Sequence, residues 1–185
     1  MVECGADVAI RVLGRPGDLG WVVMAHGEMY AAEFGWDTSF EALVARIVAD
    51  YAATRRPARE EAWVAELGGQ RVGCVFCVRR DDASAQLRLL LVHPAARGLG
   101  VGTRLVDRCV RFARDAGYRQ LVLWTDEHLA VARRIYLAAG FRLVAAEPHH
   151  DFGMDLVGQT YALDLTAARV APEEAHARPP AADSR

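Results

Sequence analysis

The chain has 185 residues, of which 52% are hydrophobic, and 22 basic residues stand against 24 acidic ones for a formal net charge of −2. All 22 basic residues are arginine, and neither lysine nor asparagine occurs anywhere in the sequence. The absence of lysine excludes lysine-dependent phosphate loops, protein kinases and Schiff-base enzymes, and the length and composition predict one compact domain.

In the first half of the chain, hydrophobic periodicity and turn residues predict three strands and two helices. The predicted elements are a strand at 6–13, helices at 18–34 and about 38–53, and strands at 62–67 and 71–80. Asp18 is expected to cap the first helix, and Thr38 or Ser39 the second, because short polar side chains accept hydrogen bonds from free N–H groups at a helix start. The pair Gly68-Gly69 predicts a tight hairpin between the last two strands.

The second half predicts strands and helices in alternation. The predicted elements are a strand at 86–92, a helix from the glycine-rich loop 97–102 to about 116, a strand at 121–125, a helix at 129–139, a strand at 141–146, an irregular loop at 147–158 and a last strand at 159–165. Residues 166–185 carry no aromatic side chain and three prolines, which predicts a disordered tail behind a domain at 1–165. The order indicates an α+β fold with a mixed, mostly antiparallel sheet flanked by helices.

Composition gives few signs of a membrane, a nucleic acid or an oxidising compartment. No stretch approaches the roughly 20 apolar residues of a membrane span, the N-terminus lacks the pattern of a signal peptide, and no basic patch indicates nucleic-acid binding. We therefore expect a cytoplasmic protein, and the arginine-rich bias is typical of a GC-rich bacterial gene. Cys4, Cys74, Cys77 and Cys109 are interpreted as structural thiols, because the Cys74-x-x-Cys77 pair lies in an apolar strand pattern.

The loop Arg97-Gly-Leu-Gly-Val-Gly102 opens a predicted helix and allows several interpretations. A dinucleotide fingerprint would need a glycine at the position of Thr103. A lysine-dependent phosphate loop is excluded because the sequence contains no lysine. The remaining interpretations are a plain flexible turn and a pyrophosphate cradle. Glycines allow close approach of the backbone, and N–H groups at a helix start bind phosphate. We predict a cradle formed by Arg97, Gly98, Leu99, Gly100, Val101, Gly102 and Thr103.

Two motifs resemble those of the GCN5-related N-acetyltransferases. Leu90-Leu-Val-His-Pro94 precedes Arg97-x-x-Gly100-x-Gly102, and Tyr136-x-x-x-Gly140-Phe141 ends the following predicted helix. The segments around His26-Gly-Glu-Met-Tyr30 and Pro148-His-His-Asp-Phe-Gly153 further resemble the transferase half of MarR-type regulator–acetyltransferase fusions. Only about seven residues precede the first predicted strand, so a DNA-binding role is not expected.

The resemblance implies that the chain has the fold of this family and catalyses acetyl transfer. Acetyl-CoA would donate its acetyl group to an amine that attacks the thioester directly. The backbone of Leu90, Leu91 and Val92 would bind the acetyl and pantetheine arm, and Tyr136 would protonate the departing sulfur. The sequence departs from the family at Leu129, where many members carry an asparagine that contacts the cofactor, so that contact is either absent or supplied by Asp126 or His128.

The general base and the acceptor are less constrained. Glu33, which lies next to Phe34, is the first candidate base and His149 the second, with a water chain as an alternative. The acceptor site is expected to include Glu28, Tyr30, Trp36, Trp124 and His150. These aromatic and acidic side chains favour a small-molecule amine, although a protein N-terminus or lysine would also fit.

Two other functions compete with acetyl transfer. A non-catalytic acyl-CoA-binding or regulatory module would keep the cradle without turnover. A metal site on His149 and His150 has no further ligands at metal spacing, so we expect no metal. The expected partners are acetyl-CoA and an amine, with neither nucleic acid nor membrane, and a homodimer is the candidate assembly.

Overall fold

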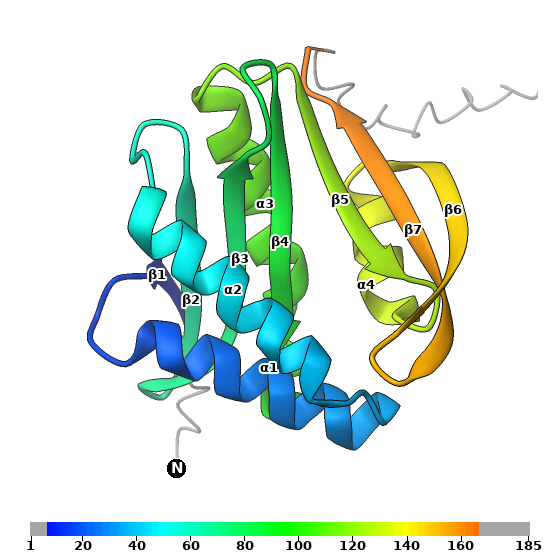
Figure 1. Ribbon diagram of the computed structural model, residues 1–185. Helices are drawn as coiled ribbons and strands as arrows, with labels where there is room; N and C mark the ends of the chain where they lie inside the picture. The colour runs from blue at the N-terminus through cyan, green and yellow to red at the C-terminus, as the bar shows by residue number, and fades with distance from the viewer. Residues whose placement is uncertain (1–6, 167–185) are drawn as a thin grey trace, which may run out of the picture.

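The computed structural model describes residues 7–166, and the chain folds there into one seven-stranded sheet with helices on both faces (Figure 1). The elements are β1 (Val8–Val12), α1 (Asp18–Phe34), α2 (Thr38–Thr54), β2 (Glu61–Leu67), β3 (Gln70–Arg79), β4 (Ser84–Val92), the short 3-10 turn η1 (Pro94–Ala96), α3 (Val101–Asp115), β5 (Gln120–Asp126), α4 (Ala130–Ala138), β6 (Arg142–Asp151) and β7 (Met154–Asp164). The predicted tail at 166–185 lies outside the described residues except for its first position.

The strands follow the order β1-β2-β3-β4-β5-β7-β6, in which β4 and β5 form the parallel pair and all other neighbours are antiparallel. The predicted α+β fold with a mixed, mostly antiparallel sheet is therefore confirmed. The hairpin at Gly68-Gly69 is also confirmed, with both glycines at positive φ. No helix within residues 7–166 is long and apolar enough to cross a membrane.

The two faces of the sheet carry separate hydrophobic cores. Helices α1 and α2 cover one face through Val22, Val44 and their neighbours, while α3 and α4 cover the other (Figure 1). Leu105 and Cys109 of α3 are fully buried there, as their helical spacing predicts. Full burial of a leucine contributes about 1.5–3 kcal/mol relative to exposure, so α3 is anchored firmly behind the loop at its start.

The first two helices begin at the predicted residues, but their N-caps differ from the prediction. The N-cap of α1 is Gly17, and the Asp18 side chain is instead fully buried, where it pairs with Arg11 at 2.7 Å and Arg71 at 2.8 Å. The Arg11 guanidinium holds the pKa of the Asp18 carboxyl well below its usual range. Asp18 is therefore a bridge between α1 and the sheet rather than a helix cap.

Helix α2 is capped by Asp37, not by Thr38 or Ser39. The Asp37 carboxylate accepts a hydrogen bond from the Ser39 N–H at 2.9 Å. Aspartate, serine and threonine all suit this position, so the local sequence did not distinguish them.

The prediction of an irregular loop at 147–158 is wrong, because β6 and β7 continue through this segment as a hairpin that turns at Phe152 and Gly153. Pro148 pairs opposite Val157 within this ladder. A proline is tolerated there because β6 is the edge strand of the sheet and has one side without a partner. Consecutive residues of a strand point to opposite faces, so His149 and His150 face different sides.

Strand β4 bends away from β5 partway along its length. The parallel ladder joins Ser84–Leu87 to 120–123 and stops there. The register of β4 against β3 then shifts, and Leu89 adopts a left-handed φ of 53°. Such a bulge bends a strand and strengthens its twist, and here it separates the ends of β4 and β5.

Candidate active site

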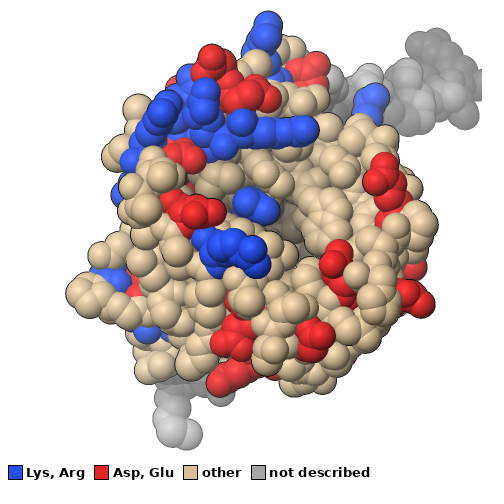
Figure 2. Space-filling view, in the orientation of Figure 1, with Lys and Arg blue, Asp and Glu red and all other residues tan. Residues whose placement is uncertain are grey.

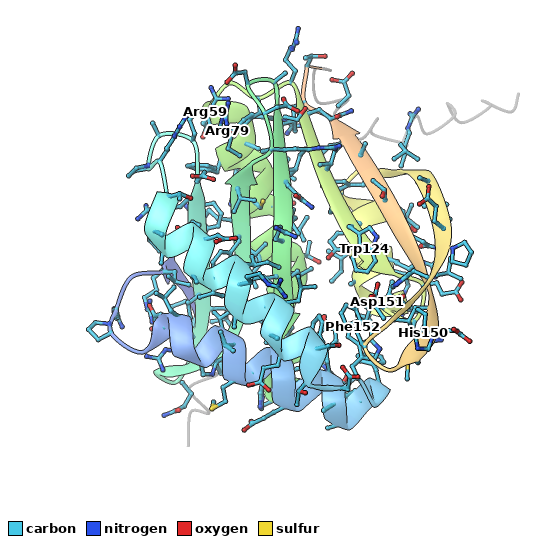
Figure 3. The ribbon with its side chains drawn as sticks, viewed as in Figure 1. Arg59, Arg79, Trp124, His150, Asp151 and Phe152 are labelled. Carbon is cyan, nitrogen blue, oxygen red and sulfur yellow. The ribbon has the colours of Figure 1, made fainter. Side chains whose placement is uncertain are left out.

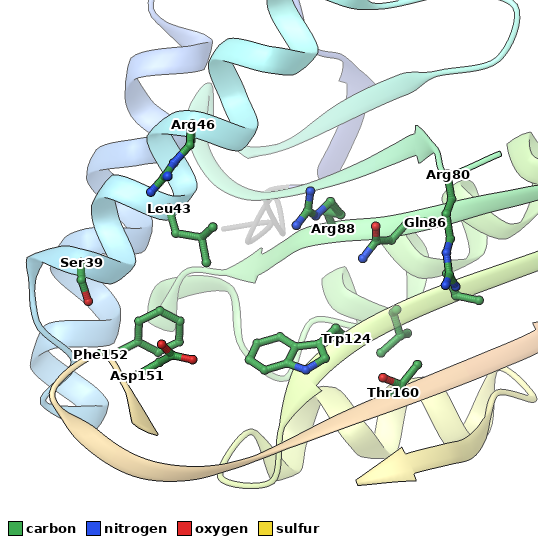
Figure 4. Close-up of a pocket in the computed structure, with 12 residues that line it drawn as sticks. Ser39, Leu43, Arg46, Arg80, Gln86, Arg88, Trp124, Asp151, Phe152 and Thr160 are labelled. Atoms are coloured by element: carbon green, nitrogen blue, oxygen red, sulfur yellow. The ribbon is translucent and has the colours of Figure 1, made fainter. Parts of the chain in front are cut away.

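A large cavity lies where β4 and β5 separate. Its volume is about 740 Å³, and its walls come from α2, the end of β3, β4, β5 and the β6–β7 hairpin (Figure 4). Trp124 of β5 forms one side and is 44% exposed. The same face appears as a hollow in the space-filling view, with arginine atoms along part of its rim (Figure 2). We refer to this space as the outer cavity.

A smaller cavity of about 110 Å³, the inner cavity, adjoins the outer one and shares Leu43, Gln86, Arg88 and Trp124 with it. Its walls also include Tyr136 of α4. Further residues from β4 and α1 line it, namely Leu89, Leu90 and Tyr30, together with Trp36 and Leu129. The inner cavity thus brings the bulged backbone of β4 together with a phenol from the opposite layer.

Tyr136 is only 4% exposed, and its ring packs edge-on against Phe141 at 5.9 Å between centroids. Burial, followed by the nearby Tyr30, raises the pKa of Tyr136 far above its ordinary value. Its hydroxyl is therefore protonated at neutral pH and is available as a proton donor in the inner cavity.

The loop before α3 has the geometry of an anion site. Gly98 and Gly100 have left-handed φ angles of 81° and 70°, and a Cβ at either position would meet nothing within 4 Å. Within the described residues, the N–H groups of Val101, Gly102 and Thr103 donate to no acceptor. Open space beside the two glycines, together with free N–H groups at a helix start, fits a diphosphate.

Gly102 has an additional role in packing. A Cβ at this position would lie 2.6 Å from Ile135 Cδ1 of α4. The glycine therefore keeps α3 and α4 in close contact, which places Tyr136 near the start of α3.

Comparison with known proteins agrees with this geometry. A model of the acetyltransferase (GNAT) family matches residues 24–141, which is more than half of the chain. This chain belongs to the GNAT acetyltransferase family. The yncA protein of Salmonella typhimurium, whose structure holds its cofactor acetyl-CoA, superposes with a TM-score of 0.71 at 22% identity, covering 91% of this chain and 99% of that one.

Relatives in sequence are acetyltransferases as well. N-acetyltransferase 8F1 of Rattus norvegicus is 39% identical over 85 residues, which is 43% of this chain and 38% of the relative. An N-acetyltransferase of Schizosaccharomyces pombe is 27% identical over 146 residues, covering 78% of this chain and 88% of the relative. The chain thus spans less than half the length of the rat protein but most of the yeast one.

Glu33, the first candidate base, lies outside both cavities of this GNAT domain. Its carboxylate pairs with the Arg97 guanidinium of the predicted cradle. Glu28, a predicted substrate contact, is exposed on α1 and also lines neither cavity. The position of Glu33 therefore favours a role in orienting Arg97 rather than in proton transfer from an acceptor.

His149, the second candidate base, is held beside the outer cavity. Its ring lies edge-on to Trp124 at 5.4 Å, its Nδ1 is 2.7 Å from Asp151 Oδ2, and its Nε2 is 3.7 Å from Asp126 Oδ2. Asp126 is fully buried, and its Oδ1 accepts from the His128 N–H at 2.9 Å. Asp126 Oδ2 and His149 Nε2 are both buried without a hydrogen-bond partner among the described residues, so two proton acceptors lie side by side.

His150 does not reach either cavity. Its side chain is mostly exposed and pairs with Asp155 at 2.7 Å, on the other side of β6 from Asp151 (Figure 3). The predicted substrate contact of His150 is therefore not supported by its position. Within residues 7–166, no group of three or more histidine, cysteine, aspartate or glutamate side chains is arranged to hold a metal ion.

The other predicted site residues are distributed between the cavities and the core. Tyr30 and Trp36 pack in a tilted arrangement, 5.0 Å between ring centroids, in an aromatic cluster that lines the inner cavity, and Trp124 lines both cavities. Cys74, Cys77 and Cys109 are buried thiols, as predicted, and Cys4 lies outside the described residues.

Four polar residues of the outer cavity were not predicted from the sequence, namely Arg46, Arg80, Arg88 and Gln86. A signal for two of them was present. Gln86 and Arg88 alternate with the buried Ala85 and Leu87 along β4. That alternation puts polar side chains on the face of the strand that lies on the side of α2.

Proposed function

We propose that this chain is an acetyl-CoA-dependent N-acetyltransferase that acetylates a small-molecule amine. The observation that carries the proposal is the inner cavity, where the bulged backbone of Leu89 and Leu90 meets the protonated Tyr136 next to a cavity large enough for an acceptor. Acetyl-CoA would place its diphosphate on the N–H groups of the loop at 98–103, in the open space left by its glycines.

The chemistry assigned to these residues follows from direct attack of an amine on a thioester. A free amine with a pKa near 10 is mostly protonated at pH 7, so it must first lose a proton. The amine nitrogen then forms a bond to the carbonyl carbon while backbone groups of Leu90, Leu91 and Val92 orient the acyl arm. As the carbon–sulfur bond breaks, Tyr136 donates its proton to the departing sulfur, and the second proton that the nitrogen loses as the amide forms restores the Tyr136 hydroxyl through solvent.

His149 is the base that we assign to the acceptor amine. With its Nδ1–H donated to Asp151, the imidazole leaves Nε2 as the proton acceptor. The neighbouring Asp126 carboxylate stabilises the positive charge that His149 gains when it takes the proton. Glu33 is not assigned this role, because its carboxylate forms an ion pair with Arg97.

We further propose a subfamily, domain bounds, a cellular location and an assembly for this protein. The segments around Tyr30 and Gly153 support a place in the family near the transferase half of MarR-type regulator–acetyltransferase fusions. The catalytic domain would span 1–165, and the protein would act in the bacterial cytoplasm without nucleic acid or membrane, with a homodimer as its assembly.

The test is release of CoA thiol from acetyl-CoA across a panel of small amines, with His149→Gln and Tyr136→Phe as variants. We expect amine-dependent release that His149→Gln slows most at low pH, where the amine most needs a base. Saturable CoA binding without thiol release from any amine would instead indicate a non-catalytic acyl-CoA-binding module, a possibility raised by Leu129 in place of the family asparagine.

A further inference from the structure

Arg88 is a charged side chain that has no ion-pair partner among the described residues. It is partly buried on β4, lines both cavities, and forms no hydrogen bond or ion pair with any residue from 7 to 166. Burial lowers the pKa of Arg88 from its ordinary value, and the charge of Asp50 partly opposes this effect. Desolvating a guanidinium without a partner costs free energy, and an anionic ligand would remove that cost.

The outer cavity has an excess of positive charge. Arg46 from α2 and Arg80 from the end of β3 also line it, and neither forms an ion pair within the described residues (Figure 4). Asp151 is the one carboxylate among its lining residues, and it is paired with His149. Three guanidinium groups thus face a single carboxylate that already has a partner.

This positive charge is separate from the predicted diphosphate site. No residue of the segment 93–103 lines either cavity. Arg97 of the cradle is paired with Glu33, whereas Arg88 lies next to the bulge at Leu89. The anion that Arg88 would hold therefore comes with the acceptor and not with the diphosphate of CoA.

We propose that the acceptor is an amino acid or a close analogue, an amine that also carries a carboxylate, and that Arg88 binds this carboxylate and so determines specificity. The proposal rests on the acetyltransferase function proposed above. Guanidinium and carboxylate form two parallel hydrogen bonds, which would fix the amine toward His149 and the thioester. The exposed Trp124 and Leu43 provide an apolar wall for the remainder of the acceptor.

The test uses matched sets of acceptors built on phenylalanine, tryptophan and methionine. Each set contains the amino acid, its α-carboxamide and the amine without the carboxyl group. We expect at least one amino acid to exceed its carboxamide at least tenfold in kcat/KM. Basicity works against this result, because loss of the carboxylate charge lowers the pKa of the amine and favours the neutral, reactive form of the carboxamide.

The Arg88→Gln variant separates recognition from chemistry. The acid-to-carboxamide ratio of kcat/KM should collapse by about 10- to 100-fold, as expected for loss of one charge-assisted contact. Arg111→Gln, an exposed arginine of α3 that lines neither cavity, is the matched control and should keep the ratio. Equal rates for acids and carboxamides in the unaltered protein would overturn the proposal while leaving the transferase function intact.

A binding measurement keeps the proposal testable without turnover. The N-acetyl derivatives of the same three amino acids should bind the unaltered protein in calorimetry and bind Arg88→Gln at least tenfold more weakly. Absence of thiol release from every amine would contradict the acetyltransferase function, and unchanged binding of these derivatives by Arg88→Gln would contradict the role of Arg88.

Discussion

Replacement of Gly100 by alanine is a sharp test of the loop before α3. Gly100 is the N-cap of the helix and has a φ of 70°, a region that costs an L-residue roughly 1–2 kcal/mol. A Cβ there meets no protein atom within 4 Å, so the added methyl group would not clash with the rest of the protein. The methyl group would occupy the space assigned to the diphosphate.

Gly69 offers a matched control in the β2–β3 hairpin. Its φ is 80° and a Cβ there also meets nothing within 4 Å, but it lies in the β2–β3 turn and not in the loop before α3. Gly69→Ala and Gly100→Ala should therefore lose similar stability, with Tm falling by about 2–4 °C per kcal/mol in a protein of this size. Only Gly100→Ala should also lose affinity for CoA.

The expected loss of affinity for CoA follows from the hydrogen bonds between the loop N–H groups and the phosphates. A hydrogen bond to a charged phosphate contributes about 1.5–3 kcal/mol, so displacing one should raise the Kd for CoA roughly 10- to 150-fold. Isothermal titration calorimetry with CoA on both variants measures this directly. A Gly100→Ala variant that binds CoA within about twofold of the unaltered protein would refute the cradle, whatever its stability.

Three further predictions concern single side chains. Tyr136→Phe should lower kcat at least tenfold in steady-state assays and leave the Kd for CoA within about twofold, since a general acid contributes roughly 10²–10⁴-fold; a normal kcat would remove its role as the acid. Glu33→Gln should keep kcat within about threefold and change mainly the KM for acetyl-CoA, because Glu33 pairs with Arg97; a hundredfold loss of kcat would restore Glu33 as the base. Asp18→Asn should destabilise the fold by about 3 kcal/mol in urea unfolding at pH 7. Because Arg11 lowers the folded-state pKa of Asp18, its contribution is present above the unfolded pKa near 4 and disappears as the pH falls below it, so the variant should show a flatter loss of stability in acid; an unchanged acid profile would contradict this.

Local patterns were sufficient for most of the fold. The helical spacing of Leu105 and Cys109 and the glycine pair at 68–69 each depend on neighbours in sequence, and the structure agrees with both. The hairpin of β6 and β7 was missed because Pro148 and the polar residues around it resemble a loop. A proline can stay in that strand only because β6 is at the edge of the sheet, which is a property of the topology and not of the segment.

The site was harder to predict because its important contacts join distant parts of the chain. Glu33 and Arg97 are 64 positions apart, so the sequence could present one as a base and the other as a phosphate ligand without indicating that they pair. Arg88 became a candidate for ligand binding because it has no ion-pair partner among the described residues. The sequence around β4 does not show which charges lie near it in space. The bulge at Leu89 likewise depends on its register against β3.

The most direct measurement of the proposed function is a stoichiometric one. The protein would be incubated with acetyl-CoA labelled with ¹³C in the acetyl group and with the amino acids named above, while thiol release is recorded and the products are analysed by mass spectrometry. Acetyl transfer predicts one equivalent of labelled N-acetyl product for each equivalent of thiol. Thiol release without a labelled amide, or saturable CoA binding without either product, would contradict it.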